Sequence, residues 1–252
     1  MPIEKLSFPG ALGAPLAGVL ERPETGARAA AVFAHCFTCG KDVKAAYYVA
    51  RELVGAGIAV MRFDFTGIGE SGGDFSRTGF TSNLQDLIAA AEAVSSRGLA
   101  VRLLVGHSLG GTASIVAARH LPEVRAVATI AAPSETRGLA EKLRRMAPEV
   151  EIAGEAEVVI GPRKLRIRRS LLEDLERHTV ADAVASLGRA LLVLHAPGDA
   201  TVPIADAARL FQLARHPRSF VSLDGADHLL TDERDARWAG RVIAAWAGRY
   251  LD

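Results

Sequence analysis

The sequence predicts an α/β protein built on a mostly parallel sheet with helices on both faces. Short apolar runs alternate along the chain with stretches of helical periodicity, which indicates strand–helix–strand crossover connections. Several runs are continuously apolar, as in strands buried on both faces. A length of 252 residues with 49% hydrophobic content is enough for one large core. Length by itself permits one domain or two.

Short apolar runs mark the expected strands. The first two are separated by Pro9, Gly10, Gly13 and Pro15 and predict a starting hairpin. The third, residues 29–34, contains no polar residue and is typical of a strand covered on both sides. In chain order the expected strands are 3–8, 16–20, 29–34, 58–63, 101–105, 124–131, 191–194 and 220–223.

Helical periodicity fills the intervals between these runs. Apolar residues recur there at the spacing of one helix face. A strand that is followed by a helix and then by a further strand forms a parallel pair, so this alternation predicts the parallel sheet. The expected helices are 43–54, 83–95, 109–119, 204–214 and 236–250.

One interval, residues 134–188, is far longer than the others. It places 55 residues between two expected strands, whereas connections are usually about 2 to 6 residues long. We expect an insertion with a helix at 138–146, a hairpin of 155–160 with 163–168, and a helix at 171–177 capped by Ser170. This helix–hairpin–helix unit would form a small cap within a single domain spanning residues 1–252.

The expected hairpin carries the basic run 163–169. If its loop is Gly161-Pro162, Glu157 lies opposite Arg166 and Glu155 lies opposite Arg168. We therefore interpret the run as paired charge on a solvated face, and not as a site for an anionic substrate or nucleic acid. The residues expected on the other face are Ala156, Val158, Leu165 and Ile167.

Charge and hydropathy exclude some classes of partner. The 30 Lys+Arg and 29 Asp+Glu residues leave a formal charge of +1, so no global field attracts nucleic acid or an anionic membrane. No apolar run approaches the roughly 18 residues of a membrane span, and the first residues lack the layout of a signal peptide. We expect a cytoplasmic protein that binds neither nucleic acid nor membrane.

The only cysteines are Cys36 and Cys39. They lie too close in sequence to staple a fold of this size, which suits a reducing compartment and predicts no disulfide framework. Two sulfurs alone do not complete a tetrahedral zinc site. We expect the pair to pack within a loop, although the C-x-x-C spacing also fits a redox pair.

Gly106-His107-Ser108-Leu109-Gly110 fits the pattern G-x-S-x-G. An expected strand precedes it and a helix of small residues follows, which is the strand, sharp turn and helix of a nucleophile elbow. The glycines leave room where the turn brings backbone segments together, and the start of the helix directs N–H groups toward the serine. We predict that Ser108 is a nucleophile.

A serine hydroxyl needs a base, and the base needs an orienting carboxylate. In nucleophile-elbow enzymes these residues follow in the order serine, acid, histidine. Asp199 comes just past the seventh expected strand and His228 just past the last. Side chains project from the carboxyl edge of a parallel sheet at these places. We predict that Asp199 is the acid and His228 the general base.

The remaining histidines and acids have other expected roles. Asp227 adjoins His228, and neighbours on one backbone rarely turn their side chains toward each other. Asp224 lies downstream of the expected position of the acid. Three histidines flank expected helix ends, namely His120, His178 and His216. Three others lie in or next to strands or the elbow, namely His35, His107 and His195. His35 could help to position a loop.

A tetrahedral oxyanion requires two hydrogen-bond donors. The elbow fold provides one from the residue after the serine and one from the loop after the third strand. These donors are the backbone N–H groups of Leu109 and Phe37. No spacing in the sequence indicates a metal or an organic cofactor, so a small-molecule acyl substrate is the expected partner.

These residues resemble those of the α/β-hydrolases that use a serine nucleophile. The resemblance rests on His35-Cys36-Phe37, residues 62–71 after the fourth strand, the elbow, the Asp199 loop and Asp227-His228, and it extends over nearly the whole chain. It implies an eight-stranded α/β-hydrolase sheet and hydrolysis of an ester or related acyl bond. The chain departs from the family in carrying Cys36 where glycine is usual.

Residues 35–42, HCFTCGKD, are similar to a narrower group. This group is the hydrolase domain that precedes an osmotically inducible protein C-like peroxidase domain in some bacterial fusions. The chain ends at Asp252 after one domain, so the resemblance implies a free-standing relative or one part of such a fusion. No peroxidase function is carried over.

Two other classes of function stay open beside the serine hydrolase. One is thiol redox chemistry at Cys36 and Cys39. The other is a non-catalytic binding module, because a fold does not determine function by itself. Loss of a serine, acid or histidine candidate is the signature of such a module, and the sequence retains all three.

Overall fold

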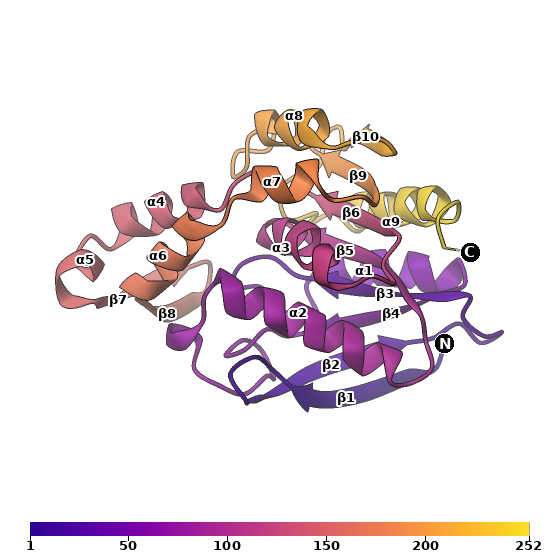
Figure 1. Cartoon of the computed structure of the whole chain (residues 1–252), viewed down its shortest axis with the longest axis horizontal. Helices are drawn as coiled ribbons and strands as arrows, with labels where there is room; N and C mark the ends of the chain where they lie inside the picture. The colour runs from indigo at the N-terminus through magenta and orange to yellow at the C-terminus, as the bar shows by residue number, and fades with distance from the viewer. Residues whose placement is uncertain (252) are drawn as a thin grey trace.

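The main sheet has eight strands in the order β1-β2-β4-β3-β5-β6-β9-β10 in the computed structural model, which describes residues 1–251 (Figure 1). β2 pairs antiparallel with β1 and with β4, and all the other pairs are parallel. This is the mostly parallel α/β-hydrolase fold that the sequence predicts. The strands are β1 (Ile3–Pro9), β2 (Pro15–Glu21), β3 (Ala29–Ala34), β4 (Ile58–Phe63), β5 (Val101–His107), β6 (Ala126–Ile130), β9 (Ala190–His195) and β10 (Arg218–Ser222).

Helices cover both faces of this sheet (Figure 1). One core lies under α2, α3 and α8, and the other lies under α1 and α9, which pack on each other. Leu104 of β5 belongs to the first core and Val105 to the second. The central strands are therefore buried on both sides, which explains their continuous apolar runs. The helices are α1 (Lys44–Gly55), α2 (Phe80–Ser95), α3 (Leu109–Ala117), α8 (Ile204–Leu213) and α9 (Glu233–Ala247), with short 3₁₀ helices η1 (Phe75–Arg77) and η2 (Ala118–His120).

Some helix ends differ from the prediction because side chains satisfy their free N–H groups. α2 begins at Phe80, three residues before the expected start, and the Asp174 carboxylate accepts the N–H of Thr81 at 2.7 Å. Since Asp174 is distant in sequence, only the folded chain reveals this contact. α9 begins at Glu233 because the Asp232 side chain caps it by accepting the N–H of Arg234.

Residues 134–188 extend from one side of the sheet, and their last helix, α7, packs on α3 and α8 (Figure 1). The two short helices α5 and α7 were not predicted. The expected cap at Ser170 is wrong: α6 starts at Arg169, with Arg168 in the N-cap position and no side-chain capping bond. The elements are α4 (Arg137–Met146), α5 (Val150–Ala153), β7 (Glu155–Ile160), β8 (Arg163–Arg168), α6 (Arg169–Arg177) and α7 (Val180–Ala185).

β7 and β8 pair antiparallel in the predicted register, with Glu157 opposite Arg166 and Glu155 opposite Arg168. The ion pairs only partly follow this register. Glu157 lies nearest to Lys164, at 2.6 Å, while Glu155 contacts Arg166 at 3.4 Å and Arg168 at 3.6 Å. On the other face Ala156, Val158 and Ile167 are buried and Leu165 is partly buried.

No helix among residues 1–251 is both long enough and apolar enough to cross a membrane.

Candidate active site

Ser108 lies at the sharp turn between β5 and α3, with a positive φ of 54°. This conformation is rare for a residue with a side chain and costs energy, so the surrounding structure must impose it. A Cβ at Gly106 would collide with the backbone of Gly110, and a Cβ at Gly110 would collide with the carbonyl of Ala34. The two glycines therefore allow the close approach that holds Ser108 in the turn.

The structure brings together the three residues that the sequence proposes for catalysis. His228 Nε2 lies 3.1 Å from Ser108 Oγ, and His228 Nδ1 lies 2.7 Å from Asp199 Oδ2. Because a carboxylate only accepts hydrogen bonds, Nδ1 carries the proton and the lone pair of Nε2 faces the serine hydroxyl. This geometry allows His228 to remove the proton of Ser108.

Asp199 is held by both of its oxygens. Its Oδ1 accepts the N–H groups of Thr201 and Val202 at 2.8 and 2.9 Å, which leaves Oδ2 for His228. Burial raises the pKa of the Asp199 carboxyl, but hydrogen bonds from Val202, His228 and Thr201 outweigh it and hold the pKa below its usual value. Asp199 is therefore ionised at neutral pH and can stabilise a positive charge on His228.

The rival acids have other partners. Asp227 accepts the N–H of Thr231 at 3.0 Å and also the hydroxyl of that residue. The Asp224 carboxylate accepts the Ser222 hydroxyl at 2.5 Å. Both carboxylates therefore accept hydrogen bonds from residues near them in the sequence.

Phe37 and Leu109 line one cavity together, at the edge of the sheet next to Ser108. Within residues 1–251, the structure gives the backbone N–H of neither residue a hydrogen-bond partner. Thr38, which follows Phe37, has a positive φ of 62°. Two N–H groups without a partner on the wall of one cavity, one of them on the residue after Ser108, are what an oxyanion site requires.

Cys36 and Cys39 are joined by a disulfide. The sequence analysis did not predict this bridge, but the bridge spans three positions of the chain and links no distant parts, so it is no framework for the fold. The N–H of Cys39 also donates to the carbonyl of Cys36 at 3.1 Å. The bridge encloses Phe37 and Thr38 and constrains the loop that carries one of the expected oxyanion donors.

Two buried histidines that the sequence did not single out hold the loops of Asp199 and His228. His107, the last residue of β5, has Nε2 2.7 Å from the backbone carbonyl of His228. His195, the last residue of β9, has Nε2 2.8 Å from the carbonyl of Val202 and 3.6 Å from Asp199 Oδ2. Both side chains are fully buried. Burial, followed by the charge of His228, lowers the pKa of His107 to about 4, so this imidazole is neutral.

His35, just after β3, holds the loop of Phe37 in the same manner. Its Nδ1 donates to the carbonyl of Cys36 at 2.8 Å, and its Nε2 accepts the N–H of Phe65 at 3.4 Å. Burial lowers its pKa to about 4. The sequence allowed for a role of His35 in positioning a loop. It offered no signal for His107 or His195 except their places at strand ends.

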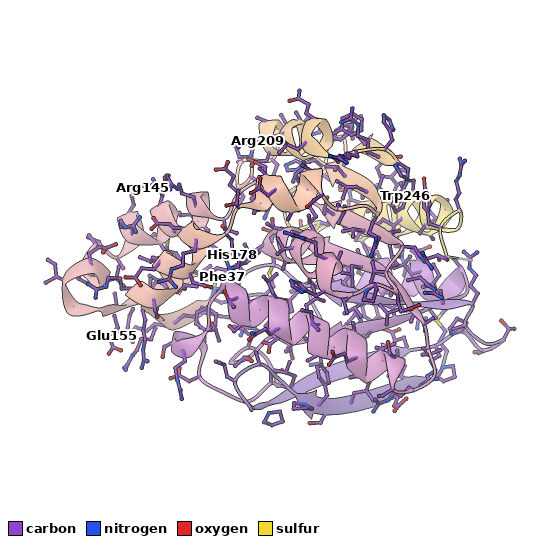
Figure 2. All side chains as sticks on the ribbon, viewed as in Figure 1. Phe37, Arg145, Glu155, His178, Arg209 and Trp246 are labelled. Atoms are coloured by element: carbon purple, nitrogen blue, oxygen red, sulfur yellow. A yellow bond between two sulfur atoms is a disulfide. The ribbon has the colours of Figure 1, made fainter. Side chains whose placement is uncertain are left out.

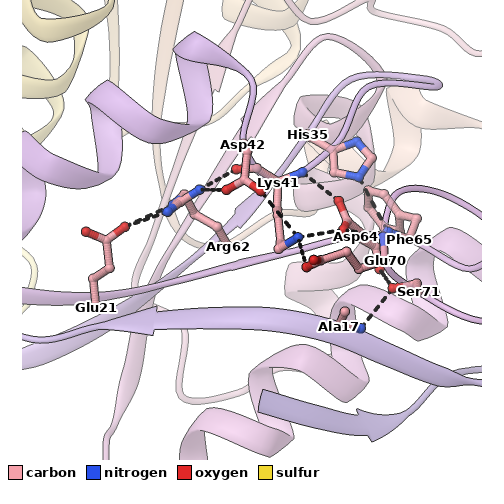
Figure 3. Close-up of polar contacts among 10 residues, drawn as sticks. All are labelled: Ala17, Glu21, His35, Lys41, Asp42, Arg62, Asp64, Phe65, Glu70 and Ser71. Atoms are coloured by element: carbon pink, nitrogen blue, oxygen red, sulfur yellow. Dashed lines mark hydrogen bonds and ion pairs between the residues drawn. The ribbon is translucent and has the colours of Figure 1, made fainter. Parts of the chain in front are cut away.

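An ion-pair network with Lys41 and Asp64 buried at its centre ties the other end of this loop to the loop after β4 (Figure 3). Lys41 Nζ contacts Asp64 at 3.0 Å and Glu70 at 2.6 Å, and the Lys41 N–H donates to Asp64 at 2.7 Å. Burial alone would lower the pKa of Lys41, but the hydrogen bonds to Glu70 and Asp64 raise it above its usual value. Arg62 extends the network to Glu21.

The 134–188 segment meets the core next to this site. Figure 2 shows that Phe37, in the loop after β3, and His178, at the end of α6, both lie near the start of α2. β8 packs against η1 and α6 packs against α2. The guanidinium of Arg163 lies near Gly40, in the loop that contains Phe37, close enough to contact a side chain if Gly40 had one.

Across residues 1–251, no group of three or more histidine, cysteine, aspartate or glutamate side chains is arranged to hold a metal ion.

Comparison with known proteins identifies related chains. A model of the alpha/beta hydrolase family matches residues 31–241. An esterase domain of a Rhodothermus marinus protein is 44% identical, with 100% of both chains covered and a TM-score of 0.81. No curated protein matches.

More distant solved structures show the same fold alone. Est1E from Butyrivibrio proteoclasticus, solved with ferulic acid, is 18% identical over 98% of this chain and 99% of its own, with a TM-score of 0.80. A Xanthomonas campestris protein described as a serine hydrolase without a lid is 22% identical over 98% and 96%, with a TM-score of 0.67.

Proposed function

The chain belongs to the alpha/beta hydrolase family, and from this premise we propose that it is a serine esterase that cleaves a carboxylic ester through an acyl-enzyme at Ser108. The observation that carries the proposal is the chain of contacts from Ser108 Oγ through His228 to Asp199, at 3.1 and 2.7 Å. The identity of 44% to an esterase domain supports the ester as the bond that is cleaved.

In the proposed reaction Ser108 Oγ attacks the acyl carbonyl while His228 takes the hydroxyl proton. Asp199 holds the imidazole in its tautomer and stabilises the imidazolium, and the N–H groups of Phe37 and Leu109 bind the oxyanion. The bond to the alcohol oxygen breaks, and His228 gives its proton to the leaving group. Water, activated by the same histidine, then releases the acid and regenerates Ser108. The proposed steps use only these residues and water.

We also propose that residues 134–188 form a cap on one side of the site. The packing of β8 on η1, and the position of the Arg163 guanidinium near Gly40, support this proposal. The substrate is a small acyl compound, and a cytoplasmic location is still the expectation from the sequence. The likeness to fusions with a peroxidase domain also stays a prediction.

The test is labelling with a fluorophosphonate, which reacts with activated serines, followed by hydrolysis of short-chain 4-nitrophenyl esters. Ser108→Ala should abolish labelling and lower kcat by about 10⁴- to 10⁶-fold. Ser95→Ala, at an exposed helix position, is the matched control and should label and turn over as the unaltered protein does. An unlabelled Ser108 in the unaltered protein would favour the binding module, and full turnover by Ser108→Ala would refute the assignment.

A further inference from the structure

The disulfide between Cys36 and Cys39 lies beside the proposed oxyanion site and has no part in the proposed reaction. It closes a tight turn, in which the N–H of Cys39 donates to the carbonyl of Cys36 at 3.1 Å. Phe37, whose N–H is a proposed oxyanion donor, is the second residue of this turn. Cys36, Phe37 and Leu109 line the same small cavity. A change at the bridge therefore acts next to the atoms that would hold the oxyanion.

Apart from the bridge, little holds this turn in its conformation. Within residues 1–251, the backbone groups of Phe37 and Thr38 have no hydrogen-bond partner. Thr38 occupies the third position of the turn with a positive φ of 62°. Glycine or asparagine is usual there, because a branched side chain makes this conformation costly. With the bridge broken, one backbone hydrogen bond closes the turn, and Thr38 is free to take a negative φ.

The chain on both sides of the turn is fixed independently of the bridge. The Nδ1 of His35 donates to the carbonyl of Cys36 at 2.8 Å, and the N–H of Lys41 donates to Asp64 at 2.7 Å. The ring of Phe37 also packs on Phe75, but a ring contact does not fix the direction of a backbone N–H. Reduction of the bridge therefore leaves the fold intact and releases the Phe37 N–H from its one direction.

The two sulfurs differ in their access to a reductant. Cys36 is buried and Cys39 is partly exposed, and exchange requires a thiolate to reach the sulfur that it attacks. A thiolate of a dithiol therefore attacks Cys39 Sγ, the S–S bond breaks, and Cys36 leaves as a thiolate that takes up a proton. The second thiol of the reductant then attacks the mixed disulfide and releases Cys39. The protein gains two electrons and two protons, and the dithiol becomes a disulfide.

We propose that Cys36 and Cys39 form a thiol–disulfide exchange site for dithiols, and that the bridged form is the active form of the enzyme because the bridge fixes the Phe37 N–H in the oxyanion site. This inference rests on the proposed esterase function. An oxidised dithiol runs the same exchange in reverse and restores the active form.

The experiment compares the bridged protein with the reduced protein. The chain has no other cysteine, so a dithiol acts on no other sulfur–sulfur bond. The protein is reduced with dithiothreitol, which is then removed because it cleaves activated esters itself. Titration with 5,5′-dithiobis(2-nitrobenzoate) in denaturant should find two thiols after reduction and none before it.

Reduction should lower kcat much more than it changes KM. For 4-nitrophenyl acetate we expect kcat to fall by at least about 10-fold, with KM within about threefold, because loss of one oxyanion donor costs about 10²- to 10³-fold in kcat. Oxidised dithiothreitol should restore kcat. Urea denaturation should show that both forms are folded under the conditions of the assay.

The variant that replaces both cysteines, Cys36→Ser with Cys39→Ser, should have the low kcat of the reduced protein. Dithiothreitol should leave its kcat unchanged, and a further fall there would place the effect of the reductant outside the bridge. Cys39→Ser alone serves if the double variant does not fold. The matched control is Ser95→Ala, which retains both cysteines and lies at an exposed helix position, and it should respond to reduction as the unaltered protein does.

Three further results would overturn the inference. Two free thiols after treatment with oxidised dithiothreitol would mean that no bridge forms. Equal kcat in the two forms, with Ser108 labelled by the fluorophosphonate in both, would remove the control by the bridge while the esterase function stands. If no ester is hydrolysed and Ser108 is labelled in neither form, the proposed esterase function fails and this inference fails with it.

Discussion

The loops around Ser108 and the 134–188 segment both rely on charged side chains, but in opposite environments. In the loops, the side chains of Lys41 and Asp64 are 5% and 2% exposed. In the hairpin of the segment, those of Lys164 and Glu157 are 66% and 54% exposed. Water can replace a lost partner in the hairpin and cannot do so in the loops.

This difference indicates what each region contributes. Buried polar groups cost free energy unless every partner is present, so they hold a loop in one conformation. Exposed pairs contribute roughly 0–1 kcal/mol and tolerate change. The precise geometry of Ser108, His228 and Phe37 thus depends on the buried contacts, whereas the segment affects the site through apolar packing on η1.

Removal of Asp64 should have the largest effect on stability. Asp64→Ala leaves Lys41 buried beside the exposed carboxylates of Glu70 and Asp42, and we expect the free energy of unfolding to fall by about 3–5 kcal/mol. Urea denaturation measures the change. Glu70→Ala should cost under about 1 kcal/mol, because Glu70 is 66% exposed. Equal losses in the two variants would contradict the comparison.

Acid should destabilise the loops through their buried histidines. The pKa values of His35 and His107 are about 4, below the usual 6.5, so only the unfolded chain takes up protons between these values. The stability is present above pH 6.5 and is lost as the pH falls toward 4, by about 2 kcal/mol per histidine between pH 7 and 5.

Urea denaturation at pH 7, 6 and 5 measures this dependence. His107→Gln should reduce the slope with pH, while His120→Gln, at an exposed histidine, should not change it. An unchanged slope in His107→Gln would show that His107 takes up its proton equally well in the folded protein.

Loss of the His107 hydrogen bond should affect catalysis more than binding. His107→Leu leaves the carbonyl of His228 without its donor at 2.7 Å, and the imidazole is then less well placed. We expect kcat to fall by about 10- to 100-fold, with KM within about twofold. His107→Gln retains a donor and should restore part of kcat. Equal kcat in the leucine and glutamine variants would mean that the hydrogen bond has no role.

The smallest effects are expected in the hairpin. Arg166→Glu removes an exposed contact at 3.4 Å from Glu155, and the free energy of unfolding should change by under about 1 kcal/mol. Turnover of neutral and of anionic esters should both be unaltered. A selective loss with the anionic ester would show that the hairpin attracts charged substrates. The exposed charges of the segment would then affect the site as well, contrary to the comparison with the loops.

Local patterns were sufficient for most of the elements. The continuous apolar runs predicted the strands of the main sheet, and the mirrored charges of residues 155–168 predicted the register of β7 and β8. They failed for α5 and α7, which are about one turn or two long and lack a clear period. They also failed at Ser170, because a capping side chain is common at such a position but was not required for α6.

The sequence by itself determined the order of the elements, the elbow around Ser108, and the choice of Asp199 and His228 as the residues to look for. These depend on local spacing and on the common edge at which parallel strands end. Only the tertiary structure decided that His107 would hold the loop of His228, 121 positions away, and that Phe75 would pack on Phe37 in the wall of the same cavity. A contact between distant residues leaves no periodic signal, because its distance and burial exist only once the strands have been brought side by side.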